Sequence, residues 1–251
     1  MIDCNPFSLE SKKILVTGAS SGIGRAIAIA CAQMGANVYL TGRDTSHLEQ
    51  TIQAMKEGCH LMLPADLARP QDIETLADWL APLDGIVHCA GISYRTPSKR
   101  IQKEDIDKIF QPNVYSVLEL QAALLQRHKV NKQASIVMLA SRAASYPSIG
   151  NAVYSASKGA LISYAKCLAL ELAPKQIRVN CICPGMVWTR LITGGALTRE
   201  ILEEAQEKYP LKRYGTPQDI AYLAVYLLSD VSAWMTGSCI DISGGGEGVL
   251  A

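Results

Sequence analysis

The chain of 251 residues is long enough to bury a large core, and its composition, with 49% hydrophobic and 19% charged residues, is that of a soluble globular protein. The formal net charge of +1 argues against a nucleic-acid-binding protein, which normally carries a basic face. No apolar run reaches the length of a membrane span, and the first residues, MIDCNPFSLESKK, lack the basic and apolar segments of a secretory signal.

Apolar runs that resemble strands alternate with amphipathic stretches along the whole chain. Seven runs are predicted to be strands, at 13–16, 37–41, 60–64, 85–89, 135–140, 178–182 and 238–242. Six stretches are predicted to be helices, near 22–34, 45–57, 70–80, 103–128, 152–173 and 217–229. This alternation predicts an α/β fold in which helices cover both faces of a parallel sheet. No repeat or linker marks a boundary, so we expect one domain over 1–251.

The first predicted strand ends in TGASSGIG, residues 17–24, and continues directly into a helical pattern. A glycine-rich turn between strand and helix lets backbone N–H groups approach a pyrophosphate without clashes from Cβ atoms. Glycines also make ordinary turns, and the spacing here is G-x-x-x-G-x-G rather than the more widespread G-x-G-x-x-G. The position between a strand and a helix favours dinucleotide binding.

The end of the second predicted strand bears on the choice of cofactor. Sites specific for NAD usually place a carboxylate there to bind the adenosine ribose hydroxyls. This chain has Gly42 at that position and Arg43 directly after it. A guanidinium suits the 2′-phosphate of NADP(H), which is the cofactor we expect. The alternative is a solvated arginine at the start of a helix that Asp44 or Thr45 caps.

A second motif, YSASK at 154–158, places a phenol and an ammonium group four residues apart on a predicted helix. Residues at i and i+4 lie on the same face of a helix. A lysine cation held close to a tyrosine favours the phenolate and lowers the tyrosine pKa. The same spacing occurs on solvated helix faces, so the pair indicates a proton donor only in combination with other motifs.

The segment 184–200 has no clear periodicity. Its glycines and polar residues predict a mobile substrate loop that leads into a short helix, within 184–210.

The eight cysteines are scattered without any C-x-x-C, and the four histidines are far apart in sequence, so we expect no metal site. Cys181 and Cys183 alternate within an apolar run, where a thiol acts as a small hydrophobic group. This usage fits the reducing cytoplasm.

TGASSGIG and YSASK together make the sequence resemble the short-chain dehydrogenase/reductase family, and the likeness extends over nearly the whole chain. Further matches are ADL at 65–67, LDGIVHCAG at 83–91, QPNVYSV at 111–117, MLASRAAS at 138–145 and CPGMVWTR at 183–190. Within the fourth predicted strand His88 and Cys89 replace the two asparagines of the family pattern. We expect His88 to be a packed strand residue rather than a catalytic one.

The resemblance implies a single-domain, Rossmann-like, doubly wound parallel sheet of the seven predicted strands, which binds NADP(H). The cofactor-binding residues that it implies are Gly18, Ser20, Ser21, Gly22, Ile23, Gly24, Arg43, Asp66, Leu67, Cys89, Ala90, Gly91, Tyr154, Lys158, Pro184, Gly185, Val187 and Thr189.

The resemblance also implies four catalytic residues, Asn113, Ser141, Tyr154 and Lys158. In the reductive direction Tyr154 protonates the developing alkoxide while NADPH delivers hydride to the carbonyl carbon. Lys158, with the positive charge of the oxidised nicotinamide, stabilises the tyrosinate and binds the nicotinamide ribose. Ser141 holds the carbonyl oxygen, and Asn113 positions a water that links Lys158 to solvent. The simpler alternatives are that Ser141 only ends a strand and that Asn113 only interrupts a helix.

Three predicted loops, 93–101, 142–151 and 186–198, are expected to shape the substrate pocket. They carry the aromatic residues Tyr94, Tyr146 and Trp188 and the arginines Arg95, Arg142 and Arg190. This mixture permits an acyl chain, a steroid-like ring or a sugar. The overall pattern is most similar to 3-oxoacyl-(acyl-carrier-protein) reductases, and the alternative enzyme is a dehydrogenase or reductase of a sugar, polyol or hydroxysteroid. A cofactor-binding sensor or scaffold has no need of all four catalytic residues.

The expected partners are a carbonyl substrate and further copies of the chain, with neither nucleic acid nor membrane. Lys132 and Lys175 are candidates for contact with an acidic acyl carrier protein, or are simply solvated. The predicted helices 103–128 and 152–173 are apolar over several faces, which favours a four-helix interface in a homotetramer, or at least a stable dimer. The C-terminal run 237–250 is expected to supply an edge strand and tail for a second interface. The alternative is a monomer whose loops cover these faces.

Overall fold

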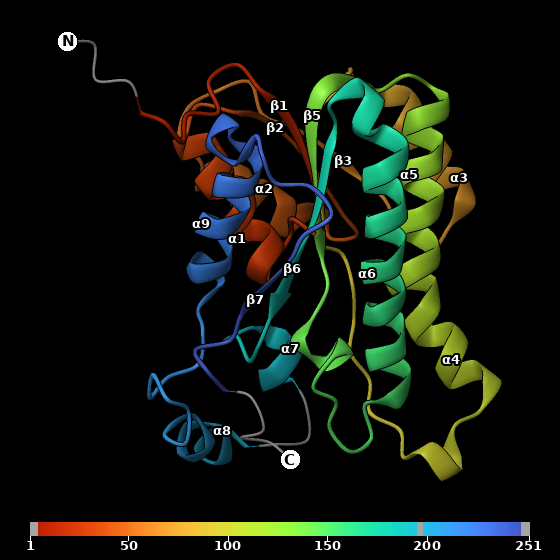
Figure 1. Cartoon of the computed structure of the whole chain (residues 1–251), viewed down its shortest axis with the longest axis vertical. Coiled ribbons are helices and arrows are strands. Elements are labelled where there is room, and N and C mark those ends of the chain that lie inside the picture. The colour runs from red at the N-terminus through yellow and green to blue at the C-terminus, as the bar shows by residue number, and fades with distance from the viewer. Residues whose placement is uncertain (1–4, 195–197, 247–251) are drawn as a thin grey trace.

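All seven predicted strands are present, and they pair side by side in one parallel sheet (Figure 1). The computed structural model describes residues 5–194 and 198–246. Within these residues the strands are β1 Lys13–Thr17, β2 Asn37–Gly42, β3 Leu61–Pro64, β4 Leu83–His88, β5 Val130–Leu139, β6 Arg178–Pro184 and β7 Cys239–Ile242. Their order is β3-β2-β1-β4-β5-β6-β7. The chain winds outward from β1 on one side and from β4 on the other, which confirms the doubly wound fold.

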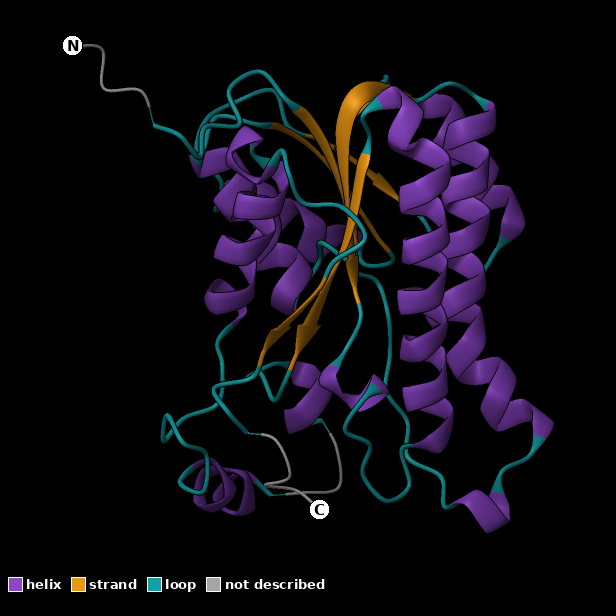
Figure 2. Ribbon diagram, in the orientation of Figure 1, coloured by secondary structure: helices purple, strands orange, loops and turns teal. Residues whose placement is uncertain are grey.

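Helices lie on both sides of this sheet (Figure 2). They are α1 Gly22–Gln33, α2 Thr45–Gln53, α3 Pro70–Trp79, α4 Lys103–Phe110, α5 Ser116–Gln126, α6 Ala152–Leu172, α7 Arg190–Thr193, α8 Arg199–Gln206 and α9 Pro217–Leu228. In the residues that the structure describes, none of the helices is long and apolar enough to cross a membrane.

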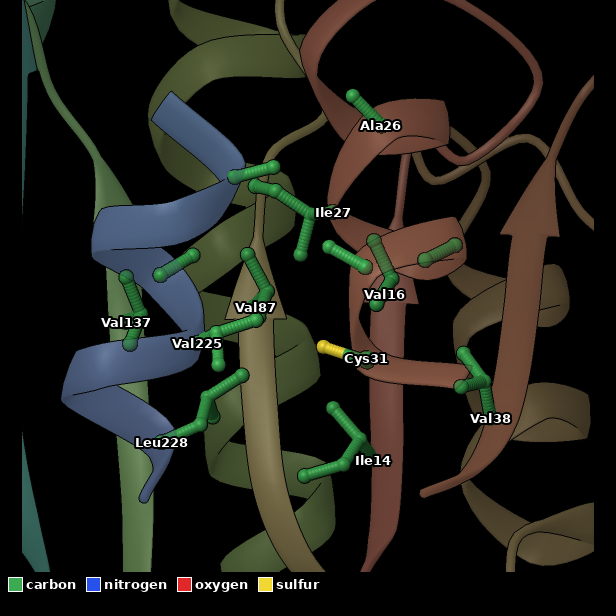
Figure 3. Close-up of a cluster of buried hydrophobic side chains, with 14 of the residues drawn as sticks. Ile14, Val16, Ala26, Ile27, Cys31, Val38, Val87, Val137, Val225 and Leu228 are labelled. Carbon is green, nitrogen blue, oxygen red and sulfur yellow. The ribbon is translucent and has the colours of Figure 1, made fainter. Parts of the chain in front are cut away.

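Two hydrophobic clusters, one on each face of the sheet, form most of the core. On one face α1 and α9 pack against each other and the strands, and Figure 3 shows this cluster around Val16, Val87 and Val137. On the other face α3, α5 and α6 cover the sheet. Successive strand residues alternate between the clusters, so that Ile14 belongs to the first and Leu15 to the second. Burial on both faces explains why the strands read as continuous apolar runs.

Short capping signals set where two of the helices begin. The carboxylate of Asp44 accepts a backbone N–H from the first turn of α2 at 3.0 Å. Thr216 and Asp219 form a reciprocal capping pair at the start of α9. Both patterns satisfy N–H groups that a helix leaves without partners at its first turn. Of the two predicted caps of α2, Asp44 is therefore the correct one.

The long helix predicted near 103–128 is divided into three parts. α4 ends at Phe110, one π-helical turn covers Gln111–Tyr115, and α5 begins at Ser116. Pro112, which has no backbone N–H, lies in this turn. A π-helical turn inserts one extra residue, and such turns concentrate at functional sites. Periodicity averaged over the whole segment does not detect one inserted residue, which is why the sequence predicted a continuous helix.

The segment predicted as a loop with a short helix, 184–210, contains α7 and α8, while its residues 195–197 lie outside the described residues. β7 is the edge strand predicted within 237–250, and residues 247–250 of that run are likewise not described.

The carboxyl ends of the parallel strands meet at one edge of the sheet, at the bottom of Figure 1. α1, which follows β1, begins at this edge, and so does α6. In doubly wound sheets ligands bind beyond this edge.

Candidate active site

One cavity of about 1470 Å³ lies along the carboxyl ends of the strands. Its volume exceeds the ~300–1,000 Å³ of a typical small-molecule site, so it has room for a dinucleotide and a substrate together. Every residue predicted to bind the cofactor lines this cavity, and so do Ser141, Tyr154 and Lys158. Asn113 does not reach its wall.

The glycine-rich turn leaves no room for side chains at two positions. Gly18 has a positive φ of 67°, and a Cβ on it would lie 3.0 Å from backbone atoms of Ala90. A Cβ on Gly24 would lie 2.3 Å from the carbonyl oxygen of Gly18. α1 follows with 12 residues, and its first turn contains no acidic side chain. Its first N–H groups and its dipole are therefore available to an anion such as a pyrophosphate.

Beside this turn, Gly42 packs against Ser20, and both line the cavity together with Arg43. A Cβ on Gly42 would lie 3.2 Å from Oγ of Ser20, so a carboxylate side chain at this position requires a shift of its neighbours. Asp66 lies in the turn after β3, where its Oδ1 accepts the N–H of Ala68 at 3.1 Å. Ser20 and the exposed Arg43 thus offer a hydroxyl and a guanidinium at this part of the cavity.

The end of β4 is anchored to β1 by a side chain that the motif analysis missed. Thr17 Oγ1 accepts the N–H groups of Cys89 and Ala90, both at 3.0 Å. His88 is buried, and its Nε2 lies 3.0 Å from Oε1 of Gln121. Burial lowers the pKa of His88 to about 4, so its imidazole is neutral at pH 7. His88 is the packed strand residue that we expected, and Thr17 fixes the neighbouring backbone without an asparagine.

Ser141, Tyr154 and Lys158 meet on one wall of the cavity. Ser141 follows β5, and its Oγ accepts the N–H of Ala143 at 3.1 Å. The Ser141 side chain lies close enough to the Tyr154 hydroxyl to act on the pKa of Tyr154. Lys158 lies one turn further along α6; its Nζ is 5.9 Å from the centroid of the Tyr154 ring and donates to the carbonyl oxygen of Leu139 at 2.8 Å. The three groups thus form a contiguous set at the junction of β5 and α6.

Burial controls the protonation of both titratable groups. It raises the pKa of Tyr154, and the hydrogen bond to Ser141 acts in the opposite direction. Burial lowers the pKa of Lys158 to about 8. In the chain by itself the Tyr154 pKa is therefore raised, where the YSASK spacing led us to expect a lowered one, because lost hydration outweighs the hydrogen bond to Ser141. Tyr154 keeps its proton at neutral pH, as a proton donor must.

Asn113 lies in the π-helical turn, fully buried, and acts as a clamp. Its Oδ1 accepts the N–H of Ile92 at 2.8 Å, and its Nδ2 donates to the carbonyl oxygen of Ile92 at 2.9 Å and to Oγ of Ser157 at 3.2 Å. These bonds join the segment after β4 to the turn of α6 that carries Lys158. Ser157 lies within the YSASK motif, but the motif did not reveal its role, because its partner is 44 residues away.

Beyond Ser141 and Tyr154, the loops after β4 and β5 form what we call the substrate end of the cavity. Of the residues predicted to shape the pocket, Tyr94, Arg95, Arg142, Tyr146 and Arg190 line the cavity. The prediction for Trp188 is wrong. Its ring packs against Tyr214 with centroids 5.4 Å apart, and its Nε1 donates to Gln206 at 3.1 Å. The ring packs against a separate small hydrophobic cluster formed by Leu202, Tyr209 and Tyr214.

Lys132 and Lys175 lie at the opposite end of the sheet from the cavity. Lys132 is in the first half of β5 and Lys175 just follows α6, whereas the cavity lies at the end of β5 and the start of α6. Gln133 Nε2 donates to Gln176 Oε1 at 3.0 Å, so the two segments adjoin at the top of Figure 1. A carrier protein bound to these lysines faces away from the cavity of the same chain.

Known proteins are similar to this chain in both sequence and architecture. Residues 18–247 match a family model described as enoyl-(acyl carrier protein) reductase. The chain is 31% identical to the 3-oxoacyl-(acyl-carrier-protein) reductase FabG of Rickettsia conorii, over 94% of this chain and 97% of the relative. It is 29% identical to the 7alpha-hydroxysteroid dehydrogenase of Escherichia coli K12, over 98% of each. A solved structure from Brucella melitensis, titled short-chain dehydrogenase/reductase and glucose/ribitol dehydrogenase, superposes with a TM-score of 0.89 at 32% identity, over 98% of this chain and 100% of the other.

Proposed function

Because the chain belongs to the short-chain dehydrogenase/reductase family of oxidoreductases, we propose that it interconverts a carbonyl compound and a secondary alcohol with NADP(H) as the hydride carrier. The observation that carries the proposal is the position of Ser141, Tyr154 and Lys158 on the wall of a cavity that also contains the glycine-rich turn. When bound, the nicotinamide supplies or accepts the hydride.

The side chains of the site divide the remaining work of carbonyl reduction. The Ser141 hydroxyl donates to the carbonyl oxygen, where negative charge grows. Tyr154, whose pKa is raised by burial, holds its proton until that oxygen becomes basic enough to take it. Lys158 lies close enough to stabilise the tyrosinate that remains, and its ammonium is available to the nicotinamide ribose. We assign Asn113 a positioning role through Ile92 and Ser157, alongside the water that we expect it to hold.

The preference for NADP(H) is supported by the residues beside the glycine-rich turn. Gly42 leaves no carboxylate to repel a 2′-phosphate, and a Cβ at this position would lie 3.2 Å from Oγ of Ser20. Arg43 offers a guanidinium to the phosphate.

For the substrate we propose a 3-oxoacyl thioester, on the strength of the likeness to 3-oxoacyl-(acyl-carrier-protein) reductase. A hydroxysteroid, sugar or polyol is the second candidate, favoured by the relatives with those names. Acyl carrier protein remains a proposed partner. Lys132 and Lys175 are too far from the cavity of their own chain to guide a carrier-bound substrate into it. We place the activity in the cytoplasm, where the free thiols of the described cysteines stay reduced.

Oxidation of NADPH against 3-oxoacyl thioesters, ketosteroids and keto-sugars tests the proposal. We expect turnover with the thioesters, and a loss of about 10²–10⁴-fold in kcat for Tyr154→Phe, which keeps the ring and removes the acid. NADPH binding, followed by its fluorescence, should survive in this variant. Full activity of Tyr154→Phe, or no turnover with any carbonyl by a protein that binds NADPH, would contradict the proposed function.

A further inference from the structure

One side of the cavity is lined by apolar side chains that follow β6. They come from α7, from α8 and from the residues on either side of these helices, and we call them the apolar wall: Met186, Leu191, Ile192, Leu202 and Tyr209. None of the five is charged, and of the five only Tyr209 carries a polar side-chain atom that forms strong hydrogen bonds. The apolar wall therefore favours contact with an apolar part of a ligand.

The small hydrophobic cluster described above supports this wall from behind. Leu202 and Tyr209 are buried members of the cluster, and Met186 and Ile192 pack against it. The rings of Tyr209 and Tyr214 are in edge-to-face contact, with centroids 5.0 Å apart. Most of the wall is thus held in place by its own packing, which reduces the entropy that is lost when a ligand binds.

The cofactor does not account for the apolar wall. Met186 and Val187 are adjacent in sequence, but Val187 packs into the core cluster around α1 and α9, whereas Met186 packs against the small cluster. Thr189 also lies near the glycine-rich turn, since its Cγ2 is 3.4 Å from where a Cβ of Gly22 would be. We expect the cofactor at Val187 and Thr189. Among the described residues of 186–209, Arg190 is the charged one that lines the cavity, and it directly follows Thr189.

The wall begins close to the residues proposed to act on the carbonyl. Ser141 follows β5 and Met186 follows β6, and these neighbouring strands pair as far as Leu139 and Ile182. Ala140 extends the pairing by donating its N–H to the carbonyl oxygen of Ile182 at 2.9 Å. Because the carboxyl ends of parallel strands meet at the same edge, Ser141 and Met186 reach the cavity at neighbouring positions.

We infer, on the basis of the proposed carbonyl chemistry, that the apolar wall binds an alkyl chain attached to the reacting carbonyl carbon. The substrate is then a 3-oxoacyl thioester with a chain longer than that of the shortest member, 3-oxobutanoyl. Each methylene that the wall removes from water raises affinity roughly three- to fourfold. The hydroxyls of a sugar or polyol would lose hydration at the same place, which disfavours those substrates.

Binding in the presence of saturating oxidised cofactor tests this inference without turnover, because that complex has no hydride to deliver. The probes are the neutral N-acetylcysteamine thioesters of 3-oxobutanoate, 3-oxohexanoate and 3-oxooctanoate, which differ only in the length of the alkyl chain. We expect calorimetry to show an affinity that rises roughly tenfold with each added pair of methylenes. Equal affinity for the three probes would overturn the inference.

Two variants on α7 locate the alkyl chain. Leu191→Asn replaces an apolar side chain with a polar one of similar size, and Ile192→Trp fills space in front of the wall. Each should lower the ratio of 3-oxooctanoyl to 3-oxobutanoyl affinity about tenfold. Leu61→Asn on the edge strand β3 is the matched control, since Leu61 is 49% exposed, against 48% for Leu191, and does not line the cavity. A ratio that stays unchanged in both α7 variants, or falls as far in the control, would overturn the inference.

The two sets of measurements separate the alkyl site from the proposed function. If no carbonyl compound is reduced while affinity still rises with chain length through Leu191 and Ile192, the proposed function fails and the alkyl site stands. If the 3-oxobutanoyl thioester is reduced and affinity does not rise with chain length, the proposed function stands and the alkyl site fails.

Discussion

The burial of Lys158 serves the proposed chemistry but lowers the stability of the fold. Its ammonium is buried at the cavity wall, and its pKa is lowered to about 8 because burial removes hydration from the charged form. At pH 7 the group is charged in both the folded and the unfolded chain, so the folded state carries the whole cost of that charge. The hydrogen bond to the carbonyl oxygen of Leu139 offsets only part of it.

Replacing this lysine should therefore stabilise the protein while inactivating it. Lys158→Met is expected to raise the free energy of unfolding at pH 7 by roughly 1–3 kcal/mol and to abolish turnover. The folded pKa of about 8 is below the unfolded value of 10.5, so the folded state binds fewer protons between these values, and the unmutated protein gains stability as pH rises through that window. The difference between variant and parent should shrink accordingly. Urea unfolding at pH 7 and pH 9.5 measures it; a difference that stays constant contradicts the account.

Arg43 offers a second test at a single residue. If its guanidinium holds the 2′-phosphate, the protein binds NADPH more tightly than NADH by roughly ten- to hundredfold, and Arg43→Ala reduces that ratio toward one. Affinity for NADH itself should hardly change. Fluorescence titration of both cofactors gives the ratio, with Lys56→Ala, another exposed cation close by in sequence, as the control. Equal affinities in the unmutated protein would show that Arg43 is a solvated helix residue.

At the scale of one element, the turn from β1 into α1 depends on the absence of a side chain. Gly24→Ala places a methyl group where Gly18 O would be 2.3 Å away, so the turn must move. We expect lower stability and a loss of NADPH binding of at least tenfold, measured by thermal unfolding and fluorescence titration. Gln33→Ala, an exposed change at the far end of α1, is the control and should leave NADPH binding unchanged. Unimpaired cofactor binding by Gly24→Ala would contradict this role of the turn.

Among the elements, regular strands and helices could be predicted from the sequence, whereas irregular backbone could not. Strand and helix identities were predictable, because a sheet covered on both faces imposes apolar runs separated by amphipathic stretches. Irregular backbone was not. β5 begins at Val130 rather than 135, with Gln133 in the left-handed region at φ 63°, and neither feature changes the hydrophobic pattern.

The candidate site was predictable where a motif is local and hidden where it is not. Gly18, Tyr154 and Lys158 belong to short motifs with fixed spacing, and the structure brings them to one cavity. The pair of Arg142 with Asp241 joins residues 99 apart, so only the register of β6 with β7 and the turn after β5 bring the two together. The prediction that Trp188 lines the pocket was wrong because nothing in its local sequence reveals the hydrophobic cluster against which its ring packs.

For the whole molecule, much of the apolar surface of α6 that led us to expect a subunit interface is buried in the core of the single chain. In α6, Leu161, Ala165, Leu168 and Leu172 pack into the core between the helices and the sheet. A stripe of other residues on the same helix is exposed, with Ala156, Ser163 and Cys167 followed by Leu170, which is 79% exposed. Small side chains one or two turns apart permit close approach of a second helix, and the apolar Leu170 favours burial.

We therefore predict that this stripe on α6 lies in a subunit interface and that the protein is a homotetramer, or at least a stable dimer. Light scattering at micromolar concentration should report the mass of four or two chains. Ser163→Arg places a long charged side chain in the stripe and should at least halve that mass, because a close helix contact has no room for it. Gln50→Arg adds the same charge on the exposed face of α2 and should leave the mass unchanged. A single-chain mass for the active, unmutated protein contradicts the prediction, and an unchanged mass for Ser163→Arg would place the interface elsewhere.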